Sequence, residues 1–78
     1  MTITITTKSG TLYKICERGD KKLLAKGNSF MAEIVRLRNP IKEGKVLEAD
    51  LQTYSIYGQP NGISHITTTE IVSLEVNF

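Results

Sequence analysis

The sequence predicts an all-β protein, a small antiparallel barrel or tight sandwich of six or seven strands. Three observations support this prediction. Apolar and polar residues alternate with a period of two, the alternating stretches are rich in β-branched residues, and turns that contain glycine separate them. At 78 residues the chain has the size of one small domain. We therefore treat residues 1–78 as a single β domain, in which barrel closure would remove exposed strand edges.

The first part of the chain predicts three short strands. Residues 2–6 alternate Thr and Ile, which is a strong strand pattern. Residues 11–17 follow after a short turn and place Tyr13 and Ile15 on one face, so the two segments predict a hairpin. Residues 22–26, beyond a second turn, predict an edge strand whose lysines would protect it from pairing with other chains.

Residues 29–38 fit either a strand or a short helix. A strand would place Phe30, Ala32 and Ile34 on one face and Met31, Val35 and Leu37 on the other. A helix would be capped by Ser29. We favour the strand because Pro40 would end a helix after little more than two turns.

The second half predicts further strands around one clear turn. Residues 46–57 form one long strand, or two with a bend, and Leu47, Ala49 and Leu51 face the same way. Tyr54 and Ile56 have the opposite phase, so burying them as well would require a bulge. The glycines and proline of residues 58–62 predict a turn, and residues 63–67 return from it. A last strand over residues 71–76 is expected to point inward with Val72, Leu74 and Val76.

The sequence lacks the groups that catalysis needs, and we expect no enzyme and no cofactor. His65 is the only histidine and Cys16 the only cysteine, so neither a catalytic triad nor a zinc site can be assembled convincingly. Glu48 and Asp50 are expected to form a solvated strand face. The glycines are scattered among turns and make no phosphate-binding loop.

Charge is divided unevenly along the chain. Residues 1–45 hold all ten Lys and Arg with four acids, a net charge of +6, whereas residues 46–78 hold four acids and no base, a net charge of −4. This asymmetry indicates an anion-binding face or a complementary contact between subunits. Alternatively, the sheet interleaves the two halves and dilutes the difference.

Seven residues are candidates for ligand contacts. Arg36 and Arg38 share a strand face and could hold a phosphate or carboxylate between two guanidinium groups. The faces of Tyr54 and Tyr57 could stack on a base, although Tyr54 equally fits a core position. The hydroxyls of Thr67, Thr68 and Thr69 could complete a site, or they could face solvent on an ordinary strand.

Three segments resemble small proteins often encoded by phages and prophages. These are Thr6-Thr7-Lys8-Ser9-Gly10-Thr11-Leu12-Tyr13-Lys14-Ile15, Pro40-Ile41-Lys42-Glu43-Gly44-Lys45-Val46-Leu47 and Thr67-Thr68-Thr69-Glu70-Ile71-Val72-Ser73-Leu74-Glu75. Thr69-Glu70 replaces a Ser-Pro pair that is usual in that group. The resemblance implies a small β protein of mobile-element origin, without known catalysis. Some small phage proteins of this size sequester cyclic-nucleotide signals or block a defence protein, but no functional residue can be carried over.

Together these observations predict a non-catalytic binding protein, a phage or mobile-element accessory or anti-defence protein. Its partner would be an anionic small molecule such as a nucleotide signal, or a host protein. The alternatives are a module for single-stranded nucleic acid and a structural or assembly protein of a virion. A core this small favours a homo-oligomer. The lone cysteine and the absence of a signal-peptide pattern or a long apolar run predict a cytoplasmic protein that does not enter a membrane.

Overall fold

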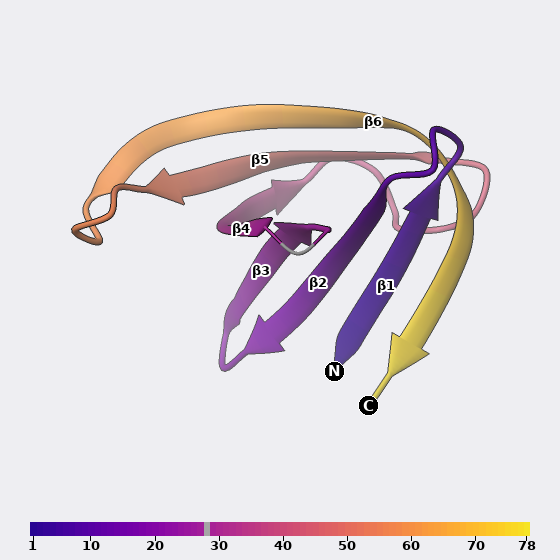
Figure 1. Ribbon diagram of the computed structural model, residues 1–78, viewed down its shortest axis with the longest axis horizontal. Helices are drawn as coiled ribbons and strands as arrows, with labels where there is room; N and C mark the ends of the chain where they lie inside the picture. The colour runs from indigo at the N-terminus through magenta and orange to yellow at the C-terminus, as the bar shows by residue number, and fades with distance from the viewer. Residues whose placement is uncertain (28) are drawn as a thin grey trace.

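The computed structural model describes residues 1–27 and 29–78, except for the side chains of residues 29–31. The described residues form antiparallel strands without a helix, which confirms the all-β prediction (Figure 1). The strands are β1 Thr2–Thr7, β2 Leu12–Arg18, β3 Lys21–Lys26, β4 Ser29–Leu37, β5 Val46–Tyr54 and β6 Pro60–Asn77. In this part of the chain no helix has the length and apolar character to cross a membrane.

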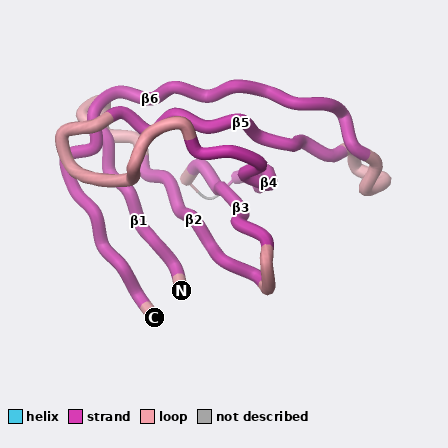
Figure 2. The backbone as a smooth tube through the Cα atoms, turned by 180° about the vertical axis from the view of Figure 1, so that it is seen from behind, coloured by secondary structure: helices cyan, strands magenta, loops and turns pink. Residues whose placement is uncertain are grey.

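Each strand pairs with the next one, and β6 returns to β1, so the sheet closes into a ring. The last strand, β6, pairs with two different strands in succession. Its residues 60–70 pair with β5, and its residues 71–77 pair with β1. Figures 1 and 2 show this division as a long β5–β6 ribbon that extends away from the other strands. β3 lies between β2 and β4, so the predicted edge position of residues 22–26 is wrong.

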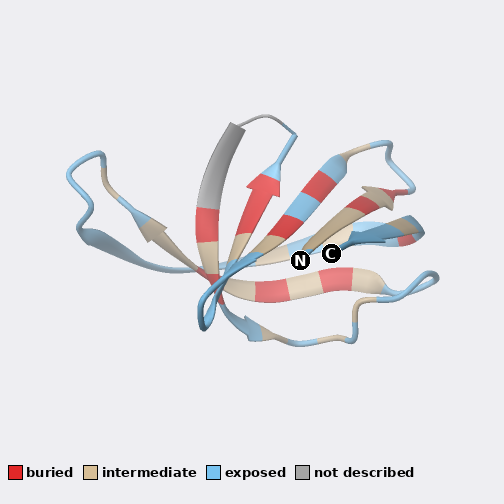
Figure 3. Ribbon diagram, turned by 90° about the horizontal axis from the view of Figure 1, so that it is seen from below, coloured by how far each residue is buried: buried red, intermediate tan, exposed pale blue. Residues whose placement is uncertain are grey.

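The core lies inside the ring and is built from the alternating apolar positions of all six strands (Figure 3). Its most deeply buried apolar side chains are Ile5, Ile15, Leu47 and Ile71. Tyr13 is buried beside Ile15, and Leu47, Ala49 and Leu51 are buried along β5, as the periodicity predicted. Burial of this alternating set from several strands is what holds so small a sheet closed.

Residues 29–37 are a strand, which resolves the choice between strand and helix. Ala32 and Ile34 lie on the same face, as predicted, and that face points into the core. The pairing with β5 shifts between Ile34 and Arg36, so the strand bulges at Val35 and Leu37 also packs against the core. The predicted faces of Phe30 and Met31 concern side chains outside the described residues.

The last strand differs from the prediction. Residues 63–67 and 71–76 belong to one strand, and its pairing shifts three times, opposite Thr53–Tyr54, Val46–Glu48 and Thr6–Thr7. Each bulge adds one residue and reverses which side chains face inward. The bulge opposite Thr6–Thr7 therefore leaves Ile71 buried and Val72 52% exposed, so the predicted inward position of Val72 is wrong. Leu74 packs against the core as predicted, whereas Val76, two residues further along the same face, is exposed near the end of the strand.

The β5–β6 turn comes earlier than predicted. β5 ends at Tyr54, and the turn is closed by hydrogen bonds from Gly58 N to Ser55 O and from Ser55 N to Gln59 O. Ile56 lies in this turn with its side chain in solvent. Because Ile56 is not buried, the bulge that its burial would have required is not needed. The strand expected over residues 46–57 is three residues too long.

Candidate functional site

Five polar residues gather on the outer surface of β5 and its two neighbours. This outer polar cluster comprises Arg38, Glu48, Asp50, His65 and Thr67. The β5–β6 register sets Asp50 opposite His65 and Glu48 opposite Thr67. Because side chains two residues apart on a strand share a face, this register brings all four side chains of the hairpin together.

Arg38 and Asp50 form the firmest contact of the outer polar cluster. The guanidinium donates from Nη2 to Oδ2 at 3.0 Å and from Nε to both carboxylate oxygens at 3.2 Å. Hydrogen bonds from Arg38, and then from His65, lower the pKa of the Asp50 carboxyl below its ordinary value. The same carboxylate raises the pKa of Arg38. This guanidinium is thus already engaged by an acid of the same chain.

His65 is held at both ring nitrogens. Nδ1 lies 3.0 Å from Asp50 Oδ1, and Nε2 lies 3.1 Å from Glu48 Oε2 and 3.1 Å from Thr67 Oγ1. The order carboxylate, imidazole, hydroxyl is that of a hydrolytic triad. Glu48 nevertheless competes for the nitrogen that would take the hydroxyl proton, and Arg38 neutralises the orienting carboxylate. These contacts tie the ring to both carboxylates, so the arrangement is better suited to bracing the hairpin than to activating Thr67.

The candidate ligand residues are distributed over several places. Arg38 and Thr67 belong to the outer polar cluster, and Arg36 lies exposed on β4 with its Cα paired to that of Asp50. The Tyr54 hydroxyl donates to Glu33 Oε1 at 2.8 Å, which raises the pKa of the phenol. Tyr57 is 85% exposed in the turn at the far end of the hairpin.

The other two threonines bond within the protein. The Thr68 hydroxyl accepts the Leu47 N–H at 3.1 Å, and the Thr69 hydroxyl accepts the Ser9 N–H at 3.1 Å. These bonds tie the β6 bulge to β5 and to the β1–β2 turn. The seven candidates therefore do not converge on one place.

Sequence reasoning missed the acids and the histidine of this cluster. The sequence predicts only a solvated strand face for Glu48 and Asp50, and it assigns His65 to no motif. A usable signal was present, because Glu48 and Asp50 have the same spacing as His65 and Thr67. A turn centred between Tyr57 and Gly58 brings the two pairs face to face.

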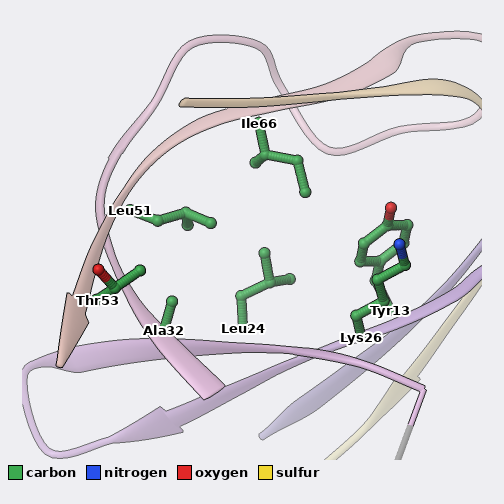
Figure 4. Close-up of a pocket in the computed structure, with 7 residues that line it drawn as sticks. All are labelled: Tyr13, Leu24, Lys26, Ala32, Leu51, Thr53 and Ile66. Atoms are coloured by element: carbon green, nitrogen blue, oxygen red, sulfur yellow. The ribbon is translucent and has the colours of Figure 1, made fainter. Parts of the chain in front are cut away.

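A cavity of about 230 Å³ lies inside the barrel. Its lining residues are Tyr13, Leu24, Lys26, Ala32, Leu51, Thr53 and Ile66, as Figure 4 shows. They come from β2, β3 and β4 on one side and from β5 and β6 on the other. None of these lining residues belongs to β1, whose pairing with β6 begins only at Ile71.

The cavity has an apolar body with a few polar groups. Leu24, Ala32 and Leu51 are buried, and Ile66 completes the apolar wall. Lys26 is paired with Tyr13 in the sheet, and Figure 4 shows the ammonium and the phenol on the same side of the cavity. Burial raises the pKa of the Tyr13 phenol, so this hydroxyl stays neutral and able to donate.

Metal binding has no support in the described residues. No three His, Cys, Asp or Glu side chains are arranged there to hold an ion. Cys16 is half-buried, with its Sγ 3.9 Å from the Thr2 hydroxyl.

The chain matches no protein-family model, no curated protein and no solved structure.

Proposed function

We propose that this protein binds a small organic anion with an apolar body and does so without chemical conversion. The observation that carries the proposal is the cavity between β2–β4 and β5–β6. An apolar hollow with a few polar groups at one side is the usual form of a small-molecule site. The lining residues supply both parts, with aliphatic side chains for the body and Lys26 and the Tyr13 hydroxyl for the head, whereas Thr53 lies at the other end of the cavity.

The volume limits the size of the ligand. A dry cavity of roughly 150 Å³ accommodates benzene. A cavity of about 230 Å³ is larger by half, which suits a substituted aromatic acid or a medium-chain carboxylate. A whole dinucleotide would extend beyond it, and only its base could enter.

The charge of the lining favours an anion. Lys26 is the one charged residue among the side chains that line the cavity, and its ammonium lies on the Tyr13 side. An ammonium next to low-dielectric walls attracts a carboxylate or phosphate more strongly than it would in water. This agrees with the anionic ligand that the basic first half of the sequence suggested.

The polar groups of the outer surface are engaged with one another. The Arg38 guanidinium is bonded to Asp50, and the hydroxyls of Thr67, Thr68 and Thr69 are bonded within the protein. A ligand there would have to displace contacts that already exist. The resemblance to phage proteins supports an accessory or anti-defence role for the protein, in which a small host signal is withheld by binding.

The proposal can be tested with three ligands of equal chain length. We expect octanoate to bind in calorimetry, octanol to bind more weakly and octylammonium to bind least. In NMR spectra the methyl signals of Leu24, Leu51 and Ile66 are expected to shift with octanoate. If none of the three ligands bound in calorimetry or shifted the NMR signals, the cavity would be refuted as a binding site.

Two pairs of variants locate the site. Ala32→Leu fills the cavity and is expected to weaken octanoate binding at least tenfold, whereas Val35→Leu adds a methylene on the outer face of the same strand and leaves binding unchanged. Lys26→Gln is expected to remove the preference for octanoate over octanol, while Lys22→Gln, also on β3, retains it. Circular dichroism checks that each variant is folded. Equal affinity in the Ala32 and Val35 variants would contradict the assignment.

A further inference from the structure

The β5–β6 ribbon leaves one long strand edge without a partner in the described part of the chain. Residues 60–70 of β6 pair with β5 on one side, and pairing with β1 on the other side starts only at Ile71. Near that point Lys8 N donates to Glu70 O and Ser9 N donates to the Thr69 hydroxyl. The opposite edge of residues 61–68 therefore presents backbone N–H and C=O groups that the ring does not use, along the outer side of β6 in Figure 1.

This edge has none of the features that usually prevent strand pairing. Residues 61–69 contain no Lys, Arg, Asp or Glu, and the only proline of the strand is Pro60 at its start. Natural proteins protect exposed edges with charges, prolines or very short strands. Three of the four lysines in the strands lie instead on β3 and the fourth, Lys14, lies on β2, and both of these strands are paired on both sides. The half of β6 that pairs with β1 does carry a charge, Glu75.

The surface beside the edge carries polar groups that contact one another and is partly apolar. In the outer polar cluster the Arg38 guanidinium pairs with Asp50, and the His65 ring contacts both Asp50 and Glu48. Ile63, on the unpaired stretch, is 60% exposed, and Ile56 in the turn is 93% exposed. Strand pairing with a neutral, β-branched segment would meet no repulsion here and would cover exposed aliphatic carbon.

We infer that this edge of β6 pairs antiparallel with the same edge of a second copy, which gives a twofold symmetric dimer with a continuous sheet. The second copy is the occupant that the charges favour, because an identical uncharged strand faces the edge and the charges flanking it are already paired. An antiparallel arrangement centred near His65 also brings Tyr57 of one copy to the level of Val72 of the other. Both side chains are exposed in the single chain, and the contact forms twice by symmetry.

The dimer would also explain how so small a core is sustained. Chains of this size commonly need a disulfide, a metal or an oligomer to supplement the core. The single cysteine excludes an internal disulfide, and the described residues hold no metal-binding group. The pairing also lies beside the cavity, because Ile66 contributes to the cavity wall and belongs to the strand with the unpaired edge.

Sedimentation equilibrium of the full chain tests the inference, with a mass of twice 8.7 kDa expected at micromolar concentrations. Ile63→Lys places like charges on both sides of the twofold axis and is expected to raise the dimer dissociation constant at least tenfold. Val35→Lys is the matched control, because Val35 is also an exposed β-branched residue but lies on a strand paired on both sides. It is expected to change the constant less than twofold.

Amide hydrogen exchange supplies a readout that does not depend on mass. In the dimer the unpaired-edge amides of residues 61–68 are expected to exchange slowly, and Ile63→Lys should restore fast exchange there while β1–β4 stay protected. A monomer at all concentrations would overturn the inference. So would a dimer that Val35→Lys disrupts and Ile63→Lys does not. A monomer whose β6 amides are protected only by a different added polypeptide would likewise replace the second copy with another occupant.

Discussion

At the scale of single residues, Asp50 connects three strands through its contacts. Its carboxylate accepts hydrogen bonds from Arg38 of the segment after β4 and contacts His65 of β6 at 3.0 Å. Since these bonds favour the ionised carboxylate, the pKa of Asp50 is lower in the folded protein than the ordinary value of about 3.9 for an unfolded chain. The ion pair therefore stabilises the folded state above that ordinary value.

This linkage predicts a loss of stability in acid. As the pH falls below about 4 and then through the folded-state pKa, the unfolded chain binds the proton first and the contribution of Asp50 disappears. Urea unfolding of the parent protein from pH 7 to pH 3 should show a falling midpoint, and Asp50→Asn and Arg38→Gln should both make that fall shallower. Arg36→Gln serves as control, because Arg36 lies on β4 two residues before Arg38 and does not make this contact. An unchanged pH dependence in Asp50→Asn would show that other groups cause the loss.

At the scale of elements, the bulges of β6 decide which side chains are buried. One bulge lies opposite Val46–Glu48, and there the Thr68 hydroxyl replaces a backbone partner by accepting the Leu47 N–H. Leu47 is among the most buried residues, so its N–H has little access to water. The side chain of Thr68 thus completes the β5–β6 ladder where the extra residue interrupts it.

We expect Thr68→Val to destabilise the protein by about 1–3 kcal/mol, because it keeps the shape and removes the acceptor of a buried N–H. Thr68→Ser restores the hydroxyl and should recover most of the loss. The free energy of unfolding from urea titrations measures both changes, and exchange of the Leu47 amide should accelerate in the valine variant alone. Equal stability of the valine and serine variants would exclude a role for this hydrogen bond.

The same hairpin shows how far the sequence alone could lead. Periodicity and β-branched composition predicted the strands and the inward sides of β2 and β5, because burial of one face requires that alternation. The turn was placed at residues 58–62, but the Ser55 bonds set it two to three residues earlier. A hairpin turn determines the register of every pair behind it. With the later turn Asp50 would lie opposite Glu70, so the pairing with His65 could not be anticipated.

The bulges of β6 and the cavity could not be predicted from the sequence either. A bulge depends on which carbonyl or hydroxyl a partner strand offers, and the run Thr67-Thr68-Thr69 does not reveal that one hydroxyl replaces a backbone group. The cavity depends on the gap between β2 and β6 that β1 leaves, which is a property of strand shear. The lining residues Leu24, Ala32 and Leu51 were recognisable as apolar, but the hollow between them was not.

At the scale of the whole molecule, the ring is closed at Ile71. The pairing of β6 with β5 ends at Glu70, and Ile71 begins the pairing with β1. The backbone of Ile71 also accepts a hydrogen bond from Gly44 N and donates one to Lys45 O. Its side chain is almost fully buried among residues of the core, whereas that of its neighbour Val72 is exposed. The bulge opposite Thr6–Thr7 is the reason why Ile71 is buried and Val72 is exposed.

Substitutions of Ile71 and Val72 therefore test directly how the ring is closed. Ile71→Ala is expected to lower the free energy of unfolding by about 2–5 kcal/mol, because it leaves a cavity where β1, β5 and β6 meet. Val72→Ala removes a solvent-exposed methyl pair and should cost less than about 1 kcal/mol. Urea denaturation of both variants provides the comparison, and the strand phase inferred from sequence alone demands the reverse order. If Val72→Ala proved the more harmful change, the bulge of β6 opposite Thr6–Thr7 and the closure of the ring through Ile71 would both be wrong.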